Sequence, residues 1–206
     1  MTNTDIYKDI SARTNGAIMI GVVGPVRTGK STFIKRFMET LVIPNIDDEY
    51  MRERARDELP QSGSGRTIMT AEPKFVPEEA VQIRLGEDAS CSVRLVDCVG
   101  YMVSGASGRF EDGSERLVTT PWFDHEVTMT EAAESGTRKV ICDHSTIGLV
   151  ITTDGSICDI DRGAYVEPEE RVVSELQSIG KPFVILLNSA EPDSEYAIEL
   201  ETKLAE

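Results

Sequence analysis

The sequence is poor in the residues that mark several kinds of protein. Among 206 residues there are one Trp and two His, and the 21 basic residues are outnumbered by 36 acidic ones. The resulting net charge of −15 argues against a nucleic-acid-binding surface and against direct docking on anionic lipid, because both need clustered Lys and Arg. We therefore expect no nucleic-acid partner. Any anion-binding site should be confined to a local group of positive charges.

Cysteines are few, and long hydrophobic runs are missing. Cys91, Cys98, Cys142 and Cys158 have neither the spacing of a metal site nor that of a disulfide framework, which predicts reduced core residues of a cytoplasmic protein. No apolar run approaches the roughly 20 residues that span a bilayer. No charged-then-apolar leader is present at the start. The expectation is a cytoplasmic protein without direct membrane insertion.

One short segment carries the main chemical signal. Residues 24–31 read Gly-Pro-Val-Arg-Thr-Gly-Lys-Ser and fit the pattern G-x-x-x-x-G-K-[ST], in which backbone N–H groups, a lysine and a hydroxyl bind phosphates and Mg²⁺. Lys30 would contact the terminal phosphates, and Ser31 the metal. The predicted nucleotide contacts in this loop are Gly24, Pro25, Val26, Arg27, Thr28, Gly29, Lys30, Ser31 and Thr32.

The flanking residues support this interpretation. Residues 17–23 form an apolar run typical of a buried parallel strand. After Ser31, apolar residues recur at the three- and four-residue spacing of a helix. A strand, a glycine-rich loop and a helix in this order place the helix N-terminus at the phosphates.

A second signal lies at Asp97-Cys98-Val99-Gly100, after another apolar run. Asp97 is predicted to serve the Mg²⁺ site, and the Gly100 N–H to reach the terminal phosphate. Mg²⁺ prefers six oxygen ligands, and a loop threonine often completes the shell. Thr70 is the preferred candidate and Thr67 the alternative, so the predicted metal ligands are Ser31, Thr70 and Asp97.

The nucleobase end departs from the guanine-binding pattern. Switch-type GTPases carry N-K-x-D after a late strand, whereas residues 188–191 here read Asn-Ser-Ala-Glu. Asn188 is retained as a predicted nucleotide contact, but the stacking lysine and the guanine-pairing aspartate are not. Specificity for guanine is therefore not supported, and adenine is acceptable. Nearby, Asp154-Gly155 is expected to form a turn.

Two residues bear on hydrolysis. Tyr101 follows Gly100, where related GTPases place a residue that orients the attacking water, and tyrosine is a poor base at neutral pH. Hydrolysis is therefore expected to be slow, or completed by another group. Arg27 is a candidate to supply positive charge in cis; the alternative is an arginine that points to solvent. The predicted catalytic set is Lys30, Asp97, Thr70 and Arg27.

Predicted helices and strands alternate along the chain. Strands are expected at 17–23, 81–85, 91–96, 146–153 and 183–187, and helices at 5–13, 31–43, 47–59, 131–143, 168–179 and 193–206. This alternation predicts an α/β fold, with a mostly parallel sheet covered by helices on both faces. Because no linker-like stretch divides the chain, residues 1–206 are expected to form a single P-loop NTPase domain of the translation-factor G type.

Taken together, these motifs carry a family resemblance. The loop at 21–35, the segments 57–62, 67–70 and 72–77, the strand end at 95–101 and the run 144–148 resemble the amino-terminal domain of the stage IV sporulation protein A family, the spore-coat morphogenetic ATPases. The resemblance covers about residues 5–188. Ala71 departs from it, because a second threonine is expected there.

The resemblance implies further properties. It implies an ATPase, using ATP and Mg²⁺, whose turnover drives self-association into a polymer around the forespore in the mother-cell cytoplasm. It also implies other coat proteins as partners, and recruitment by a small membrane-bound sporulation peptide. Family members continue past residue 206 through middle and C-terminal domains that are absent here, and the last strand and helix of the G domain are expected to be missing too.

Two other functions remain open from the sequence. One is a GTP-dependent regulatory switch. The other is a nucleotide-binding scaffold without turnover, for which Tyr101 is the motive.

Overall fold

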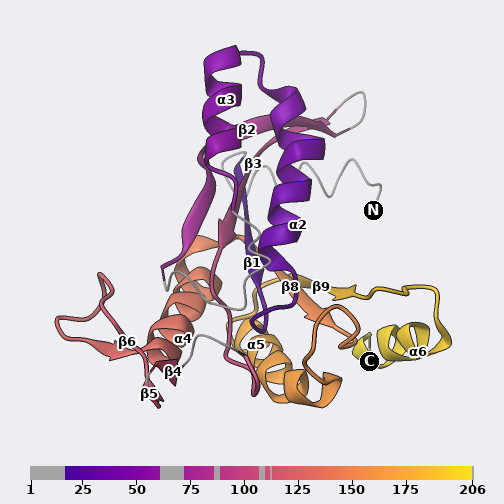
Figure 1. The fold of residues 1–206 in the computed structure, drawn as a ribbon. Helices are drawn as coiled ribbons and strands as arrows, with labels where there is room; N and C mark the ends of the chain where they lie inside the picture. The colour runs from indigo at the N-terminus through magenta and orange to yellow at the C-terminus, as the bar shows by residue number, and fades with distance from the viewer. Residues whose placement is uncertain (1–16, 61–71, 86–88, 107–109, 112, 206) are drawn as a thin grey trace.

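A five-stranded sheet forms the centre of the computed structural model, which describes residues 17–60, 72–85, 89–106, 110–111 and 113–205 (Figure 1). Its strand order is β2-β3-β1-β8-β9. The strands are β1 (Ala17–Val23), β2 (Lys74–Leu85), β3 (Ala89–Asp97), β8 (Ile147–Thr153) and β9 (Phe183–Asn188). The pairs β1/β3, β1/β8 and β8/β9 are parallel, and β2 is antiparallel to β3. The predicted mostly parallel α/β sheet is confirmed.

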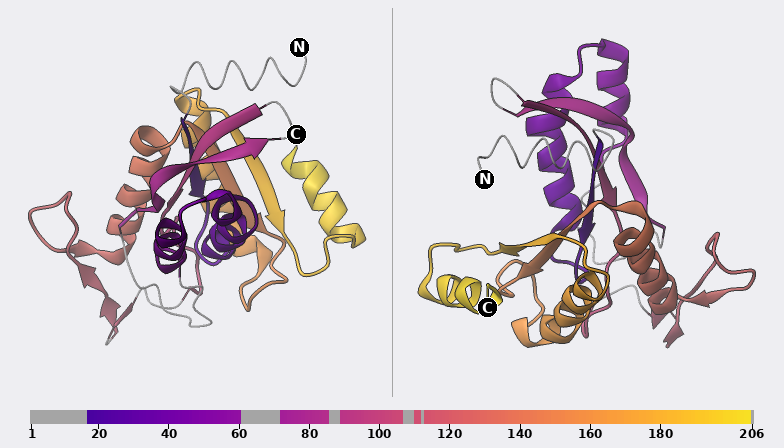
Figure 2. Two further views of the ribbon diagram at one scale, coloured as in Figure 1. Left: turned by 90° about the horizontal axis from the view of Figure 1, so that it is seen from above. Right: turned by 180° about the vertical axis from the view of Figure 1, so that it is seen from behind.

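Helices cover both faces of this sheet (Figure 2). The helices are α2 (Lys30–Phe37), α3 (Glu49–Asp57), α4 (Met129–Lys139), α5 (Val166–Ser178) and α6 (Glu195–Leu204). Short turns extend three of them: Met38–Val42 and Ile43–Asn45 follow α2, Val140–His144 follows α4, and Arg162–Tyr165 precedes α5. No helix in the described part of the chain is both long and apolar enough to cross a bilayer.

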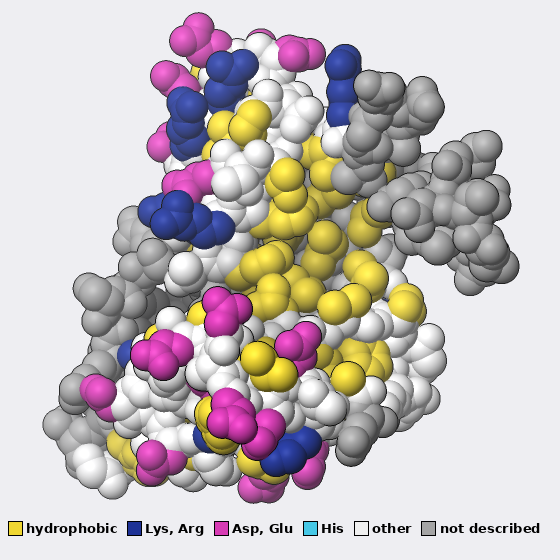
Figure 3. Space-filling model, turned by 90° about the vertical axis from the view of Figure 1, so that its right-hand side faces the viewer, with side chains coloured by type: hydrophobic (Ala, Val, Ile, Leu, Met, Phe, Trp, Pro, Cys, Tyr) yellow, Lys and Arg dark blue, Asp and Glu magenta, His cyan; other side chains and the backbone are white. Residues whose placement is uncertain are grey.

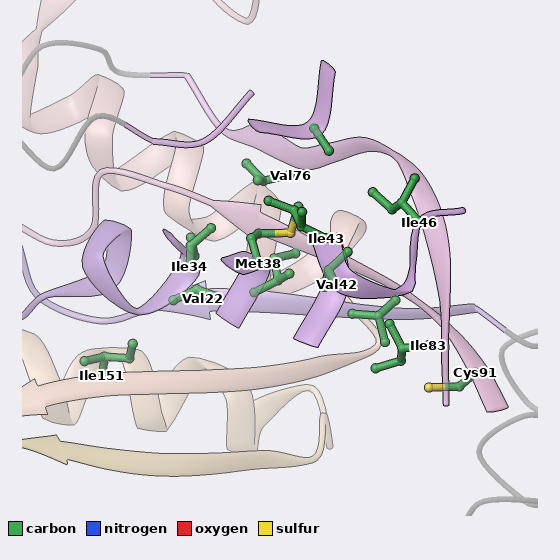
Figure 4. Packing of buried hydrophobic residues seen from close by; sticks show 13 residues of the cluster. Val22, Ile34, Met38, Val42, Ile43, Ile46, Val76, Ile83, Cys91 and Ile151 are labelled. Atoms are coloured by element: carbon green, nitrogen blue, oxygen red, sulfur yellow. The ribbon is translucent and has the colours of Figure 1, made fainter. Parts of the chain in front are cut away.

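The core on the α2 face is built from alternate strand residues. Val22 of β1 and Leu95 of β3 point to this side and are fully buried with Ile34 and Met38 (Figure 4). Side chains of a strand alternate between faces, so their neighbours Val23 and Val96 must face the other way. Burying apolar surface at about 25 cal/mol per Å² makes this packing a main source of stability.

The opposite face holds the second core. Val23, Val96 and Val150 pack there against Val172 and Leu176 of α5. The turn that follows α4 also contributes buried residues to this cluster. The α5 helix and the segment that ends α4 are thereby packed on this face of the sheet.

The β9 side of the sheet is less well covered. Val184 of β9 is 56% exposed, and Leu149 and Leu186 are only partly buried against the α2-face core. Figure 3 shows hydrophobic side chains gathered on this side of the molecule. The α6 helix lies beside β9 at this edge (Figure 1).

Several sequence expectations change in detail. The strand predicted at 81–85 begins earlier, at Lys74, because the chain pairs with β3 on both sides of an irregularity between Val76 and Val81. No strand was predicted between residues 97 and 145, yet this stretch contains two-residue strands at Phe110–Glu111, Ser114–Glu115 and Leu117–Val118, the last paired with Val127–Thr128. The helix predicted at 5–13 lies outside the described residues.

The expectation about cysteines is partly wrong. Cys91 and Cys98 are buried and Cys158 is half-buried, but Cys142 is exposed. Cys142 belongs to the Val140–His144 turn at the end of the α4 segment. A short helical segment has one side that faces solvent, and Cys142 lies on that side. The sequence pattern around Cys142 did not show which side it would occupy.

Candidate functional site

The loop between β1 and α2 depends on two glycines. Gly24 has φ 131°, and a Cβ added there would lie 2.3 Å from the carbonyl oxygen of Ile151. Gly29 has φ 94°, and its Cβ would lie 2.5 Å from Nδ2 of Asn188. Only glycine accepts both the left-handed conformation and the close approach. The spacing of these glycines therefore reflects a real constraint of the backbone.

Lys30 is buried inside this loop. Its side chain turns back so that Nζ donates to the carbonyl oxygens of Pro25 at 2.5 Å and Gly24 at 3.3 Å. Burial lowers the pKa of Lys30, while electrostatic interactions with the side chains of Cys98 and Asp97 oppose that shift. A bound anion beside this ammonium would compensate the cost of burying it.

Asp97 and Ser31 meet because their strands are neighbours. Asp97 ends β3 opposite Val22 of β1, and Ser31 Oγ donates to Asp97 Oδ2 at 3.1 Å. The second oxygen, Oδ1, is buried without a hydrogen-bond partner. Burial raises the pKa of Asp97, although the charge of Lys30 and the Ser31 hydrogen bond oppose this.

These oxygens fit a magnesium ion. Mg²⁺ binds through few protein oxygens together with water and phosphate, and the unpartnered Oδ1 and the Ser31 hydroxyl are suitable donors. The described residues contain no group of three or more His, Cys, Asp or Glu that could hold a metal by themselves. Water and phosphate oxygens would complete the shell of a Mg²⁺ ion bound by these two residues.

Gly100 lies against the loop. It has φ 94°, and a Cβ added there would lie 2.2 Å from the Gly24 carbonyl oxygen and 2.6 Å from Lys30 Nζ. Its N–H donates to Thr137 Oγ1 of α4 at 3.1 Å. The structure thus brings Gly100 beside Lys30 and adds Thr137 as a partner that the sequence did not indicate.

The side chain of Tyr101 is anchored on α5, although its carbonyl oxygen accepts from the Val26 N–H of the loop at 2.9 Å. Its ring is 2% exposed and lies under the guanidinium of Arg171, 4.4 Å from the ring centroid. Its hydroxyl donates to a carboxylate oxygen of Glu175 on α5. Burial, followed by this hydrogen bond, raises the pKa of Tyr101 far above neutral pH. A phenol in this setting is unsuited to act as a general base.

Cys98 is also unsuited to covalent chemistry. The thiol is buried and donates to the Val22 carbonyl oxygen at 3.5 Å. Burial raises the pKa of Cys98 to about 11. Because the thiolate is the nucleophilic form of cysteine, this side chain is inert at neutral pH.

The nucleobase end is formed where β8 and β9 terminate. Asn188 Nδ2 donates to the carbonyl oxygen of Thr28 at 3.0 Å, joining this end to the phosphate loop. Ser189 Oγ donates to Asp154 Oδ2 at 2.6 Å. Glu191 is exposed, so the residue in the place of the guanine-pairing aspartate is not held against the site.

Asp154 forms the predicted turn and also accepts hydrogen bonds from two serine hydroxyls. Its Oδ1 accepts from the backbone N–H of Ser156, which is the expected turn, and also from the Ser156 hydroxyl. Burial acts to raise the pKa of Asp154, but hydrogen bonds from Ser156, Ser189 and Thr153 outweigh it and lower the pKa. An ionised carboxylate therefore organises this end of the site.

Most of the predicted site residues come together, with exceptions. The loop 24–31, Asp97, Gly100 and Asn188 are joined by the contacts above, whereas Thr32 is exposed on α2. Arg27 is half-buried with φ 63°, close enough to Tyr165 for its charge to lower the pKa of that phenol, which burial raises overall. Thr70 and Thr67 lie outside the described residues.

The fold and site together define an α/β domain with a glycine-containing loop between a strand and a helix at the carboxyl ends of parallel strands. Comparison with known proteins identifies the family. Residues 1–206 match the family model described as stage IV sporulation protein A, ATPase domain, and the chain belongs to this family.

Curated relatives agree. The chain is 60% identical over 204 residues to stage IV sporulation protein A of Clostridioides difficile, and 57% identical over 192 residues to that of Bacillus subtilis. These matches cover 99% and 93% of the chain but 42% and 39% of the relatives. A solved structure of an SsGBP mutation variant is also similar, with 14% identity, a TM-score of 0.41 and coverage of 100% of this chain and 53% of that one. At that TM-score, the likeness carries no argument.

Proposed function

We propose that this chain binds ATP with Mg²⁺ at the loop 24–31 and hydrolyses it slowly. The observation that carries the proposal is the convergence of Lys30, Ser31 and Asp97, with Asp97 Oδ1 buried and unpartnered. A buried ammonium and an unpaired carboxylate oxygen are costly features, and a magnesium–triphosphate complex would satisfy both. Membership of a family described as an ATPase domain points to the same chemistry.

The roles follow from the positions. Lys30 would bind the terminal phosphates, and Ser31 and Asp97 would hold Mg²⁺, with Thr70 as the proposed further ligand. When bound, Mg²⁺ would neutralise charge on the phosphate oxygens. Asn188 would brace the loop through Thr28, and Arg27 would add positive charge near the reacting phosphate. In sum, we propose a P-loop NTPase domain related to translation-factor GTPases.

ATP is proposed over GTP because of the nucleobase end. Guanine recognition relies on a carboxylate that pairs with two base N–H groups, and Glu191 is exposed where that carboxylate would be needed. Ser189 is too short to stack along a base, and its hydroxyl is bonded to Asp154. A site that lacks matched partners for guanine loses its preference for that base.

We further propose a role in spore-coat assembly. In the longer protein, ATP turnover would drive self-association into the base layer of the coat around the forespore, in the mother-cell cytoplasm at the outer forespore membrane. Other coat proteins and a small membrane-bound sporulation peptide would be partners through regions outside this chain. The support is the identity to proteins named for stage IV of sporulation.

The test is phosphate release by the purified chain with ATP and GTP, compared with Lys30→Ala. We expect ATP turnover in the wild type and a loss of at least about 100-fold in Lys30→Ala, since the lysine stabilises charge on the transferred phosphoryl group. Arg36→Ala, an exposed change on the same helix, is the matched control. Turnover that Lys30→Ala leaves intact, or that requires GTP, would overturn the proposal.

A second candidate is a nucleotide-binding scaffold without turnover. Its support is Tyr101, which bonds to Glu175 and leaves the position after Gly100 without a side chain able to activate water. This function predicts that ATP binds with Mg²⁺ while no phosphate is released. Nucleotide binding measured alongside turnover distinguishes the two candidates.

A further inference from the structure

Gly100 is held by a partner from a distant helix. Its N–H donates to Thr137 Oγ1 at 3.1 Å, and the Thr137 hydroxyl in turn donates to the Ala133 carbonyl oxygen at 2.8 Å. Thr137 and Ala133 are fully buried within α4. Buried polar groups keep their hydrogen bonds, and the Gly100 N–H has its hydrogen bond with Thr137, with the Cys98 thiol beside both groups.

This arrangement conflicts with the role proposed for the same N–H. A terminal phosphate at Lys30 would accept from the Gly100 N–H, yet one N–H makes one good hydrogen bond at a time. Contact with the phosphate therefore requires the bond to Thr137 to break. A nucleoside diphosphate lacks the terminal phosphate and leaves that bond in place.

The neighbouring residues limit the movement to a short segment, Val99-Gly100. On one side, Cys98 is fixed by its bond to Val22. On the other, the Tyr101 carbonyl accepts from the Val26 N–H at 2.9 Å and its hydroxyl bonds to Glu175. Between these fixed points Gly100, at φ 94°, has the backbone freedom that reorientation of a peptide needs.

We propose that Thr137 sets the discrimination between nucleoside triphosphate and diphosphate, acting as a positioning residue that competes with the terminal phosphate for the Gly100 N–H. The inference rests on the proposed nucleotide site. The energy of the bond to Thr137 is lost only when a triphosphate binds, so it weakens triphosphate binding relative to diphosphate binding.

The test uses Thr137→Val in the whole chain, with affinities measured for ADP and for the β,γ-imido analogue of ATP in the presence of Mg²⁺. Valine keeps the volume but removes the hydroxyl, so the Gly100 N–H loses its hydrogen bond to Thr137 and a terminal phosphate no longer has to displace that bond. We expect analogue affinity to rise about fivefold with ADP affinity unchanged. Thr137→Ser, which retains a hydroxyl, should behave like the wild type.

An unchanged ratio of the two affinities in a folded Thr137→Val chain would overturn the inference. If that variant does not fold, the wild type still decides: the Gly100 amide NMR resonance should shift with the analogue and stay in place with ADP. A resonance that responds equally to both would overturn the inference. Failure of the wild type to bind either nucleotide would instead overturn the proposed function, and this inference with it.

Discussion

The phosphate end and the nucleobase end of the site differ in burial and in how closely they keep a known pattern. At the phosphate end Val26, Thr28 and Lys30 are at most 5% exposed. At the nucleobase end Ser189 is half-buried and Glu191 is exposed. The phosphate end is held by backbone geometry that tolerates few substitutions. The nucleobase end is formed by side chains that are partly or fully exposed.

The difference follows from what each end must bind. All nucleoside triphosphates share the same phosphates, so a loop that binds them needs fixed backbone positions, as the close approaches at Gly24 and Gly29 illustrate. The base is what varies between nucleotides. Exposed side chains such as Glu191 can be exchanged without disturbing the core, which explains how specificity for a base can change while the loop remains.

Asn188 links the two ends. It is the one residue of the Asn-Ser-Ala-Glu segment that contacts the phosphate loop, through the Thr28 carbonyl oxygen. Its side chain also lies close enough to Gly29 to exclude any larger residue there. The hydrogen bond to Thr28 supports the loop without the involvement of a base.

The largest effect is expected for Asp97→Asn at the phosphate end. The amide is neutral and a weaker ligand for Mg²⁺, so ATP turnover should fall about 100-fold or more. Phosphate release over a range of Mg²⁺ concentrations measures this. Activity equal to the wild type at low Mg²⁺ would exclude Asp97 from the metal site.

The same variant has a predicted effect on stability with the opposite sign. Burial raises the pKa of Asp97, so its ionised form destabilises the fold at neutral pH, and Asp97→Asn should raise the free energy of unfolding by on the order of 1 kcal/mol. As pH falls toward the raised pKa, the wild type becomes protonated and the difference narrows. Urea unfolding of both proteins at neutral and mildly acidic pH tests this.

Much of the phosphate end could be predicted from the sequence because it is built from local and neighbouring pieces. The loop joins a strand directly to a helix, and Asp97 reaches Ser31 because β1 and β3 are adjacent parallel strands with Val22 opposite Asp97. The sequence indicated the loop 24–31 and the segment 97–100 because each is a short motif that follows an apolar run. Parallel pairing of the two strands was then enough to bring them together.

The contacts that were missed depend on packing between distant elements. Thr137 reaches Gly100 from α4, 37 residues further along the chain, and nothing in the sequence of that helix indicates this partner. The bond from Ser189 to Asp154 joins the ends of β8 and β9 across 35 residues. The Asp154-Gly155 sequence indicates the turn alone.

Arg27→Ala tests a side chain of the loop 24–31 and should have the second largest effect on ATP turnover. If the guanidinium stabilises charge on the reacting phosphate, turnover should fall about 10- to 100-fold with little change in ATP affinity. Alanine at φ 63° is a non-glycine residue like arginine, so the backbone strain is similar in both.

Arg27→Lys, which keeps a positive charge, is the control and should retain part of the activity. A loss of thermal stability without a change in turnover would instead assign Arg27 to support of the neighbouring Tyr165.

The smallest effect is expected at the nucleobase end, from Ser189→Lys combined with Glu191→Asp. These changes restore the guanine-type pattern beside Asn188, with a shorter carboxylate for the base and a cation that Asp154 can hold in place of the Ser189 hydroxyl. We expect the affinity for GTP relative to ATP to rise about tenfold, measured by competition against a fluorescent ATP analogue. Glu191→Asp alone should give less, because the stacking side chain is still missing. A ratio unchanged in both variants would place base selection in the Asp154 and Ser156 cluster, and the contrast between a fixed phosphate end and a replaceable nucleobase end would no longer hold.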